Sequence, residues 1–247
     1  MKLLPLAAAA ASLAVATAAF ALGDDDRGPG LPGQRQGDAI VYPAQGFDTV
    51  GLGGAAHVEV RVGGNYSVRA VGPAAAFGNF RVEVRDGALN VGPRYRNRHG
   101  DDDLQKHITV YVTLPHLKGA NVGGSGSLHA DRVEGAEFSA AVGGSGSLRV
   151  DAVRADRVNA SIGGSGDIRA AGMAKALNVN IGGSGSFTGP DMHASSAKVS
   201  SAGSGRVRAV VDGPAKVSLV GSGEIDLGSA ARCSVTKMGS GSVRCGA

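Results

Sequence analysis

The stretch 119-GANVGGSGSLHADRVEGAEFSAAVGGSGSLRV-150 decides the fold, because it contains two successive copies of one repeating unit. The marker of this unit, the tripeptide Gly-Ser-Gly, recurs seven times at intervals of 18 to 20 residues. The serines of the tripeptides are Ser125, Ser145, Ser165, Ser184, Ser204, Ser222 and Ser240. A fixed period of this length is the signature of a repeat architecture.

Apolar residues hold the same places around all seven serines. The third residue after each serine is Leu, Ile, Phe or Val, and the fifth residue before it is Ala or Val. The residues between these places are mostly small and polar. This alternation predicts β-strands that turn one face inward. Each unit is therefore expected to be a strand, a Gly-Ser-Gly corner and a second strand, followed by a return segment.

A unit of 18 to 20 residues suits one turn of a parallel β-solenoid, whose turns stack about 4.8 Å apart. The unit is too short for a strand–helix–strand crossover and has no helical period. Glycine supplies the positive φ of a sharp corner, and the serine hydroxyl is expected to bond to corner backbone groups. The 41 glycines and the aromatic content of 4% then reflect many corners and a narrow interior. The sequence thus predicts an all-β solenoid with coils of 18–20 residues.

The rest of the chain divides by composition. Residues 1–21 are predicted to be a signal peptide, with a basic start, an Ala-rich apolar run and cleavage before Leu22. A membrane anchor is the alternative for this segment. Residues 22–37 are expected to be a flexible linker. Residues 38–117 alternate polar and apolar residues without Gly-Ser-Gly, which predicts an irregular N-terminal β cap and first coils. Residues 118–247 form the repeat solenoid.

The signal peptide predicts export to the periplasm, the outer surface or the medium, with no transmembrane segment after its removal. The net charge of +4 is too small to indicate binding of nucleic acid. Within the cap, residues 94–106 are expected to form a charged loop, because they interrupt the strand pattern.

Several of these features together resemble the head GIN domain family of auto-transporter adhesins. The resemblance rests on export, on 47-FDTV-50 and 88-ALNV-91, and on 112-VTLPHLKGANVGGSGSL-128, in which Pro115 closes a strand just before the first repeat. It covers roughly residues 40 to 247. The resemblance implies a right-handed parallel β-helix at the bacterial cell envelope, and it brings no catalytic residues with it.

Motifs for catalysis, cofactors and metals are weak. Residues 51–56 match the G-x-G-x-x-A dinucleotide fingerprint, but a strand pattern follows where a helix would have to begin. Asp167 stands one place early for a calcium-binding repeat, and the six histidines form no metal-ligand pair. We therefore predict no catalytic residue, no cofactor and no metal. A polysaccharide-active β-helix enzyme, a lyase or hydrolase, stays as the alternative function.

A basic stripe is the first feature that suggests a partner. The fourth residues after the serines are His129, Arg149, Arg169, Thr188, Arg208, Asp226 and Arg244. Stacked coils would place Arg149 beside Arg169, which is unfavourable unless acids such as Asp151 and Asp167 compensate or an anion binds. The stripe is either a solvated charged face or a docking site. In the second case Arg149, Arg169, Arg208 and Arg244 would bind an anionic surface glycan or envelope polymer.

The two cysteines are the second such feature. Cys233 and Cys245 both fall in inward-facing places of the last coil. Because export leads to an oxidising compartment, they are predicted to form a disulfide, with two free buried thiols as the alternative.

The sequence as a whole favours a non-catalytic, exported solenoid of the cell envelope. An adhesin, another ligand-binding protein and a purely structural protein all fit this description, and the sequence does not separate them.

Overall fold

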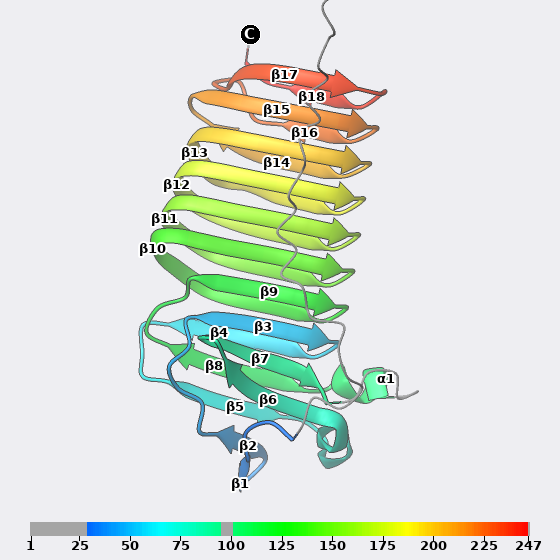
Figure 1. Cartoon of the computed structure of the whole chain (residues 1–247). Coiled ribbons are helices and arrows are strands. Elements are labelled where there is room, and N and C mark those ends of the chain that lie inside the picture. The colour runs from blue at the N-terminus through cyan, green and yellow to red at the C-terminus, as the bar shows by residue number, and fades with distance from the viewer. Residues whose placement is uncertain (1–28, 95–100, 247) are drawn as a thin grey trace, which may run out of the picture.

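The computed structural model describes residues 29–94 and 101–246 (Figure 1). The predicted signal peptide and the start of the predicted linker lie outside these residues. The strands are β1 (Gln34–Gln36), β2 (Ala39–Tyr42), β3 (Thr49–Gly54), β4 (His57–Val62), β5 (Ser67–Val71), β6 (Phe80–Arg85), β7 (Ala88–Pro93), β8 (Thr109–Leu114), β9 (Gly119–Gly124), β10 (Ser127–Gly144), β11 (Ser147–Gly164), β12 (Asp167–Gly183), β13 (Ser186–Gly203), β14 (Arg206–Val211), β15 (Pro214–Gly221), β16 (Glu224–Asp226), β17 (Arg232–Met238) and β18 (Ser242–Arg244). The helices are a 3₁₀ helix (Ala74–Asn79) and α1 (Asp101–Gln105).

The repeat region is a parallel β-solenoid, as the repeat predicted. Each of β10 to β13 is 17 or 18 residues long and bends around most of one coil. Each of these strands pairs in parallel with its counterpart in the next coil, and the chain continues through β14 and β15, then β16 and β17, then β18. Figure 1 shows these coils stacked one above another, from the cap to the red C-terminal coil.

The interior is filled by the predicted apolar ladders. The residues three places after the first six serines are all at most 1% exposed. They are Leu128, Leu148, Ile168, Phe187, Val207 and Ile225. The residues five places before the serines are also expected to face inward. For Val235, the fifth residue before Ser240, this expectation is wrong, since it is 46% exposed. Val235 belongs to β17, and no strand in the described part of the chain pairs with the outer edge of β17, so no further coil covers it.

A buried polar side chain interrupts one of the inward ladders of the repeat. Ser201 is 3% exposed, and its hydroxyl has no hydrogen-bond partner among the described residues. Its neighbours in register, Ile181 and Leu219, are apolar and fully enclosed. A buried hydroxyl without a partner costs about 1–3 kcal/mol of desolvation.

Substituting Ser201→Ala should therefore raise the free energy of unfolding by about 1 kcal/mol, because it removes the unpaired hydroxyl and adds no volume. The measurement is urea unfolding, with the shift in midpoint compared between variants. Ser218→Ala is the matched control, since Ser218 lies exposed on an adjacent coil and its change should be nearly neutral. A destabilised Ser201→Ala protein would show that the hydroxyl has a partner in solution.

The two glycines of each corner are required on different physical grounds. The glycine before each serine adopts a positive φ, as at Gly144 (120°) and Gly164 (119°). The glycine after each serine has no such φ, but a Cβ there would come within about 3 Å of the previous coil; at Gly166 it would lie 2.5 Å from the carbonyl oxygen of Gly146. Conformation and close packing both require the first glycine, whereas close packing alone requires the second.

The seven serines lie at the corners, but the role expected of their hydroxyls is wrong. Their backbone N–H groups donate to the previous coil, as Ser165 does to the Gly144 carbonyl at 2.9 Å. Their hydroxyls are exposed, and within residues 29–94 and 101–246 none bonds to corner backbone. The single contact is between the hydroxyls of Ser222 and Ser240, 3.1 Å apart. The corners are therefore held by backbone hydrogen bonds.

The N-terminal cap contains the first coil and a small antiparallel cover. β3 and β4 pair in parallel with β9 and β10, so the corner between β3 and β4 stacks under the first Gly-Ser-Gly. The dinucleotide-like stretch 51–56 thus joins two strands and opens no helix. β2 and β5 pair antiparallel, as do β6 and β7. Figure 1 shows these elements closing the lower end of the rod.

Two parts of the cap differ from the expectations. The expected linker extends to residue 37, but β1 lies inside it and pairs with β2. Leu31 also packs against the core, with its N–H donating to the Val82 carbonyl at 2.7 Å. The expected loop at 94–106 includes α1, and Gln105 at the end of α1 is 1% exposed. A single buried residue in a charged run gives no periodic signal, so the sequence did not reveal it.

Candidate functional site

The basic stripe predicted from the sequence is one straight ladder on the outer face of the rod. Strand pairing brings its members into register one coil at a time. We call this set the Arg ladder, and it consists of Glu59, His129, Arg149, Arg169, Thr188, Arg208, Asp226 and Arg244. All eight side chains are exposed or half-buried, because they alternate with the inward ladders on the same strands. The anion-binding role of the ladder stays a prediction.

Acidic neighbours neutralise two of the four predicted arginines. The Arg149 Nε donates to the Asp151 carboxylate at 2.6 Å, as expected for a compensating acid. The Arg244 guanidinium lies 3.4 Å from the Asp226 carboxylate on the adjacent coil. The other expected compensator, Asp167, accepts a hydrogen bond from Ser186. The charges of the stripe are therefore not equivalent.

Arg169 and Arg208 are the exceptions. Both are exposed, and neither makes an ion pair or hydrogen bond with any residue in the described part of the chain. They lie two coils apart on the same line, with Thr188 between them. These two guanidinium groups are the ones that can take an external anion without first losing a protein carboxylate.

A charged network at the cap end of the ladder includes residues that the sequence analysis did not connect. The His129 ring lies between two carboxylates, with Nδ1 2.8 Å from Glu59 and Nε2 2.7 Å from Asp151. Burial disfavours the charged imidazole, but the hydrogen bonds to Asp151 and Glu59 outweigh it and raise the pKa of His129. The hydrogen bond from Arg149 lowers the pKa of Asp151. Aligning the first corner, residues 54–56, with Gly-Ser-Gly would have placed Glu59 beside His129.

This network gives stability a defined pH dependence. Because the folded pKa of His129 is raised, its contribution is complete below the unfolded value of about 6.5 and is lost as the pH rises through the folded pKa. Because the folded pKa of Asp151 is lowered, its contribution is present above its unfolded value and is lost in acid. The network therefore stabilises the fold most between about pH 4 and 6.5.

The wild-type melting temperature should decrease between about pH 6 and pH 8.5, and His129→Gln should remove this decrease. The effect is expected to be below about 1 kcal/mol, because the groups are partly exposed. Melting curves across this range, for both proteins in one buffer series, provide the measurement. His193→Gln is the control, since His193 lies 3.5 Å from a single carboxylate. Parallel pH profiles of wild type and His129→Gln would contradict the assignment.

A Ser–His contact lies beside the network. The His57 Nδ1 is 2.7 Å from the Ser127 hydroxyl, in the ladder two residues away on the same strands. A serine nucleophile is activated by a base that a third group orients, and no other side chain of the described residues is hydrogen-bonded to the His57 ring. A shallow pocket of about 430 Å³ does exist, but it lies elsewhere, around Arg154, Met173 and Lys175, and neither member of the pair lines it.

The opposite outer face of the coils has a different character. It carries small side chains and a short amide ladder, in which Asn178 donates to Asn159 at 2.8 Å and Asn159 donates to Glu137 at 2.6 Å. Lys198 and Lys216 are exposed neighbours in register on this face. These two lysines offer a charge-matched comparison for the Arg ladder.

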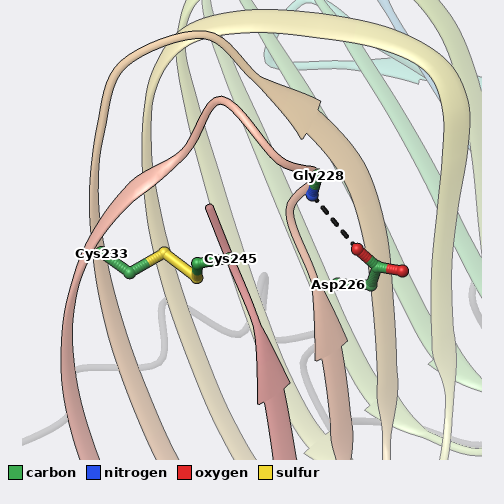
Figure 2. The surroundings of a disulfide bond; sticks show 4 residues. All are labelled: Asp226, Gly228, Cys233 and Cys245. Atoms are coloured by element: carbon green, nitrogen blue, oxygen red, sulfur yellow. Dashed lines mark hydrogen bonds between the residues drawn. A yellow bond between two sulfur atoms is a disulfide. The ribbon is translucent and has the colours of Figure 1, made fainter. Parts of the chain in front are cut away.

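The predicted disulfide is present. Cys233 and Cys245 are joined, with their Cα atoms 6.2 Å apart, and both pack against the core (Figure 2). Figure 2 also shows the Asp226 carboxylate accepting a hydrogen bond from the Gly228 N–H, at 3.1 Å, in the adjacent coil. The disulfide closes the last coil of the solenoid, which no further coil of the described chain covers.

Two other features are absent from residues 29–94 and 101–246. No three His, Cys, Asp or Glu side chains gather there as a metal would need. No helix among these residues is long and apolar enough to span a bilayer.

Solved structures share this fold over most of the chain. A "putative adhesin" from Bacteroides fragilis is 18% identical with a TM-score of 0.75, covering 84% of this chain and 95% of that one. A "Putative lipid binding protein" from Parabacteroides distasonis is 21% identical with a TM-score of 0.66 and the same coverage. A "putative adhesin" from Parabacteroides merdae is 18% identical with a TM-score of 0.61, covering 89% and 97%. Identities this low show the shared fold alone.

A comparison with curated protein sequences finds no match. A family match carries more weight than the structural likeness, because it follows the sequence itself. The match begins at residue 46, just before β3, and ends at residue 231, just before β17. It therefore leaves out β1 and β2 but includes the first coil, the rest of the cap and nearly all of the repeat. Since it spans well over half of the sequence, the chain belongs to the family described as "Putative auto-transporter adhesin, head GIN domain".

Proposed function

We propose that the protein is an exported, non-catalytic binding protein of the cell envelope that holds an anionic polymer along the Arg ladder. One observation carries the proposal: Arg169 and Arg208 are exposed on one line of the rod without ion-pair partners in the described residues. Two like charges on one line of the rod, neither paired with a carboxylate of the described residues, favour a partner that supplies the acids.

The shape of the surface favours a polymer over a small molecule. The Arg ladder follows the outer face of stacked strands, and none of its residues lines the shallow pocket around Arg154, Met173 and Lys175. A small ligand is held by a concave site that surrounds it, whereas an extended chain can make one contact per coil. Anionic surface glycans and envelope polymers have this extended form.

The exported and non-catalytic parts of the proposal draw on the family. Its description names an adhesin head domain, and two proteins of similar structure are each named a "putative adhesin". The Ser127–His57 pair lies outside the pocket, which gives no support to the alternative of a polysaccharide-active enzyme.

Binding of the mature protein to immobilised anionic polysaccharides, with neutral dextran as the reference, tests the proposal. The double variant Arg169→Ser/Arg208→Ser should bind at least about tenfold more weakly, and added salt should weaken the wild type, since exposed charges are screened. Lys198→Ser/Lys216→Ser removes the same charge from the opposite face and should bind like the wild type.

Equal losses in both double variants, or binding that ignores salt, would contradict the proposal. The same incubations also test the enzyme alternative. Release of unsaturated products or new reducing ends from any of the polymers would support a lyase or hydrolase in its place.

A further inference from the structure

We infer that the Arg ladder selects a linear polysaccharide with an anionic group on alternate sugars, and this inference rests on the proposed function. The order of charges along the rod leads to it. From the coil with the third Gly-Ser-Gly on, the ladder reads Arg169, Thr188, Arg208, Asp226 and Arg244, one residue per coil. Arginine stands on every second coil, and an uncharged or acidic residue stands between.

The spacing suits an extended sugar chain. Neighbouring coils are about 4.8 Å apart, so Arg169 and Arg208 stand roughly 10 Å apart along the rod axis, as do Arg208 and Arg244. A β-linked pyranose residue in an extended chain advances by close to one coil spacing. A polymer lying along the axis would therefore present one sugar to each coil. Anionic groups on alternate sugars would then meet successive arginines.

The two residues between the arginines favour uncharged sugars. Thr188 is half-buried and offers a hydroxyl that can donate or accept a hydrogen bond with a sugar hydroxyl or amide. The carboxylate of Asp226 lies between Arg208 and Arg244 in the ladder, and it is 21% exposed. A second anion placed over Asp226 would be repelled, whereas a neutral sugar could donate a hydrogen bond to it.

The ladder also has a natural end. Arg149 lies on the coil directly before Arg169, so counting it would place two arginines on neighbouring coils and break the alternation. Its guanidinium is already bonded to Asp151 at 2.6 Å, and Asp151 in turn contacts His129. The alternating segment therefore begins at Arg169 and spans five coils, with Arg169 and Arg208 as its arginines without ion-pair partners in the described residues and Arg244, 3.4 Å from Asp226, at its end.

The test compares two oligosaccharide series of equal sugar number. Hyaluronan oligosaccharides carry a carboxylate on alternate sugars, and β-linked oligomannuronates carry one on every sugar. The wild-type protein should bind the hyaluronan oligosaccharides at least about fivefold more tightly, although they have half the charge. Isothermal titration calorimetry at fixed ionic strength gives both affinities.

The variant Thr188→Arg/Asp226→Asn should reverse this order. It adds a cation at one intervening coil and removes the carboxylate at the other, while Asn keeps an oxygen for the Gly228 N–H. Ser218→Arg/Asp212→Asn makes the same changes of charge at exposed sites outside the ladder and should leave the order unchanged. A folded state in all variants is checked by circular dichroism.

The outcomes separate the inference from the proposed function. Tighter binding of oligomannuronate by the wild type, in proportion to its charge, would overturn the alternation and leave the anion-binding function standing. Binding of neither series, with no effect of Arg169→Ser/Arg208→Ser on any anionic polymer, would overturn both. If the wild type prefers hyaluronan and the control variant reverses this preference as well, overall charge and not the ladder sets the order of affinities. That result would overturn the inference.

Discussion

Substituting Gly164→Ala should lower the free energy of unfolding by about 3–5 kcal/mol, a large effect for one methyl group. Two costs add at this corner. The φ of 119° is open to glycine and strained for alanine. The new Cβ would also lie 2.6 Å from the carbonyl oxygen of Gly144 in the previous coil, where backbone cannot yield easily. Urea unfolding and the melting temperature measure the loss.

The adjacent residue supplies the control. Gly163 has no positive φ, and a Cβ there would meet no atom within 4 Å. Gly163→Ala should therefore be neutral or stabilise the fold by up to about 1 kcal/mol, because alanine restricts the unfolded chain. Equal losses for the two variants would show that the corner relaxes around a side chain, contrary to the geometry.

Removing the disulfide with Cys233→Ala/Cys245→Ala should cost about 3 kcal/mol by the loop-closure model and should loosen the last coil in particular. The bond spans 12 residues in the coil that has no described successor. Hydrogen exchange should become faster in β17 and β18 and change little in β10 and β11, since a solenoid coil depends on its direct neighbours.

Val158→Ala is a suitable comparison for this variant, because Val158 lies buried in β11 and its loss should speed exchange in β10 to β12 rather than in β17 and β18. Unchanged exchange in β17 and β18 would show that packing alone holds the last coil. A thiol titration of the unfolded, unreduced wild-type protein should find no free cysteine.

The repeat made most of the fold predictable. Periodic serines fixed the length of each coil, and alternation around them fixed which face turns inward, so Leu148 and Ile168 could be placed in the core by counting. The same counting failed at Val235, because periodicity describes a coil's sequence and not whether another coil covers it. Strand β1 and helix α1 occur once each, and a single short element leaves no period to detect.

The position of the candidate site could be predicted from the sequence, but which of its arginines are paired with acids could not. The register placed Arg149 and Arg169 side by side, as the sequence suggested. Which arginine is neutralised depends on side-chain rotamers: Asp151 bends back to Arg149, while Asp167 bonds to Ser186. The contact between Glu59 and His129 joins residues 70 positions apart, across the unrecognised first corner.

The bond between Cys233 and Cys245 also determines how the rod would respond to mechanical load. Hydrogen bonds between coils lie along the rod axis, so tension on the C-terminal side would peel strands away one coil after another. Force that reaches Cys245 crosses the sulfur bridge to Cys233 and bypasses the corner between them. The tip is thereby kept from fraying, and the first coil to yield under shear lies deeper in the stack.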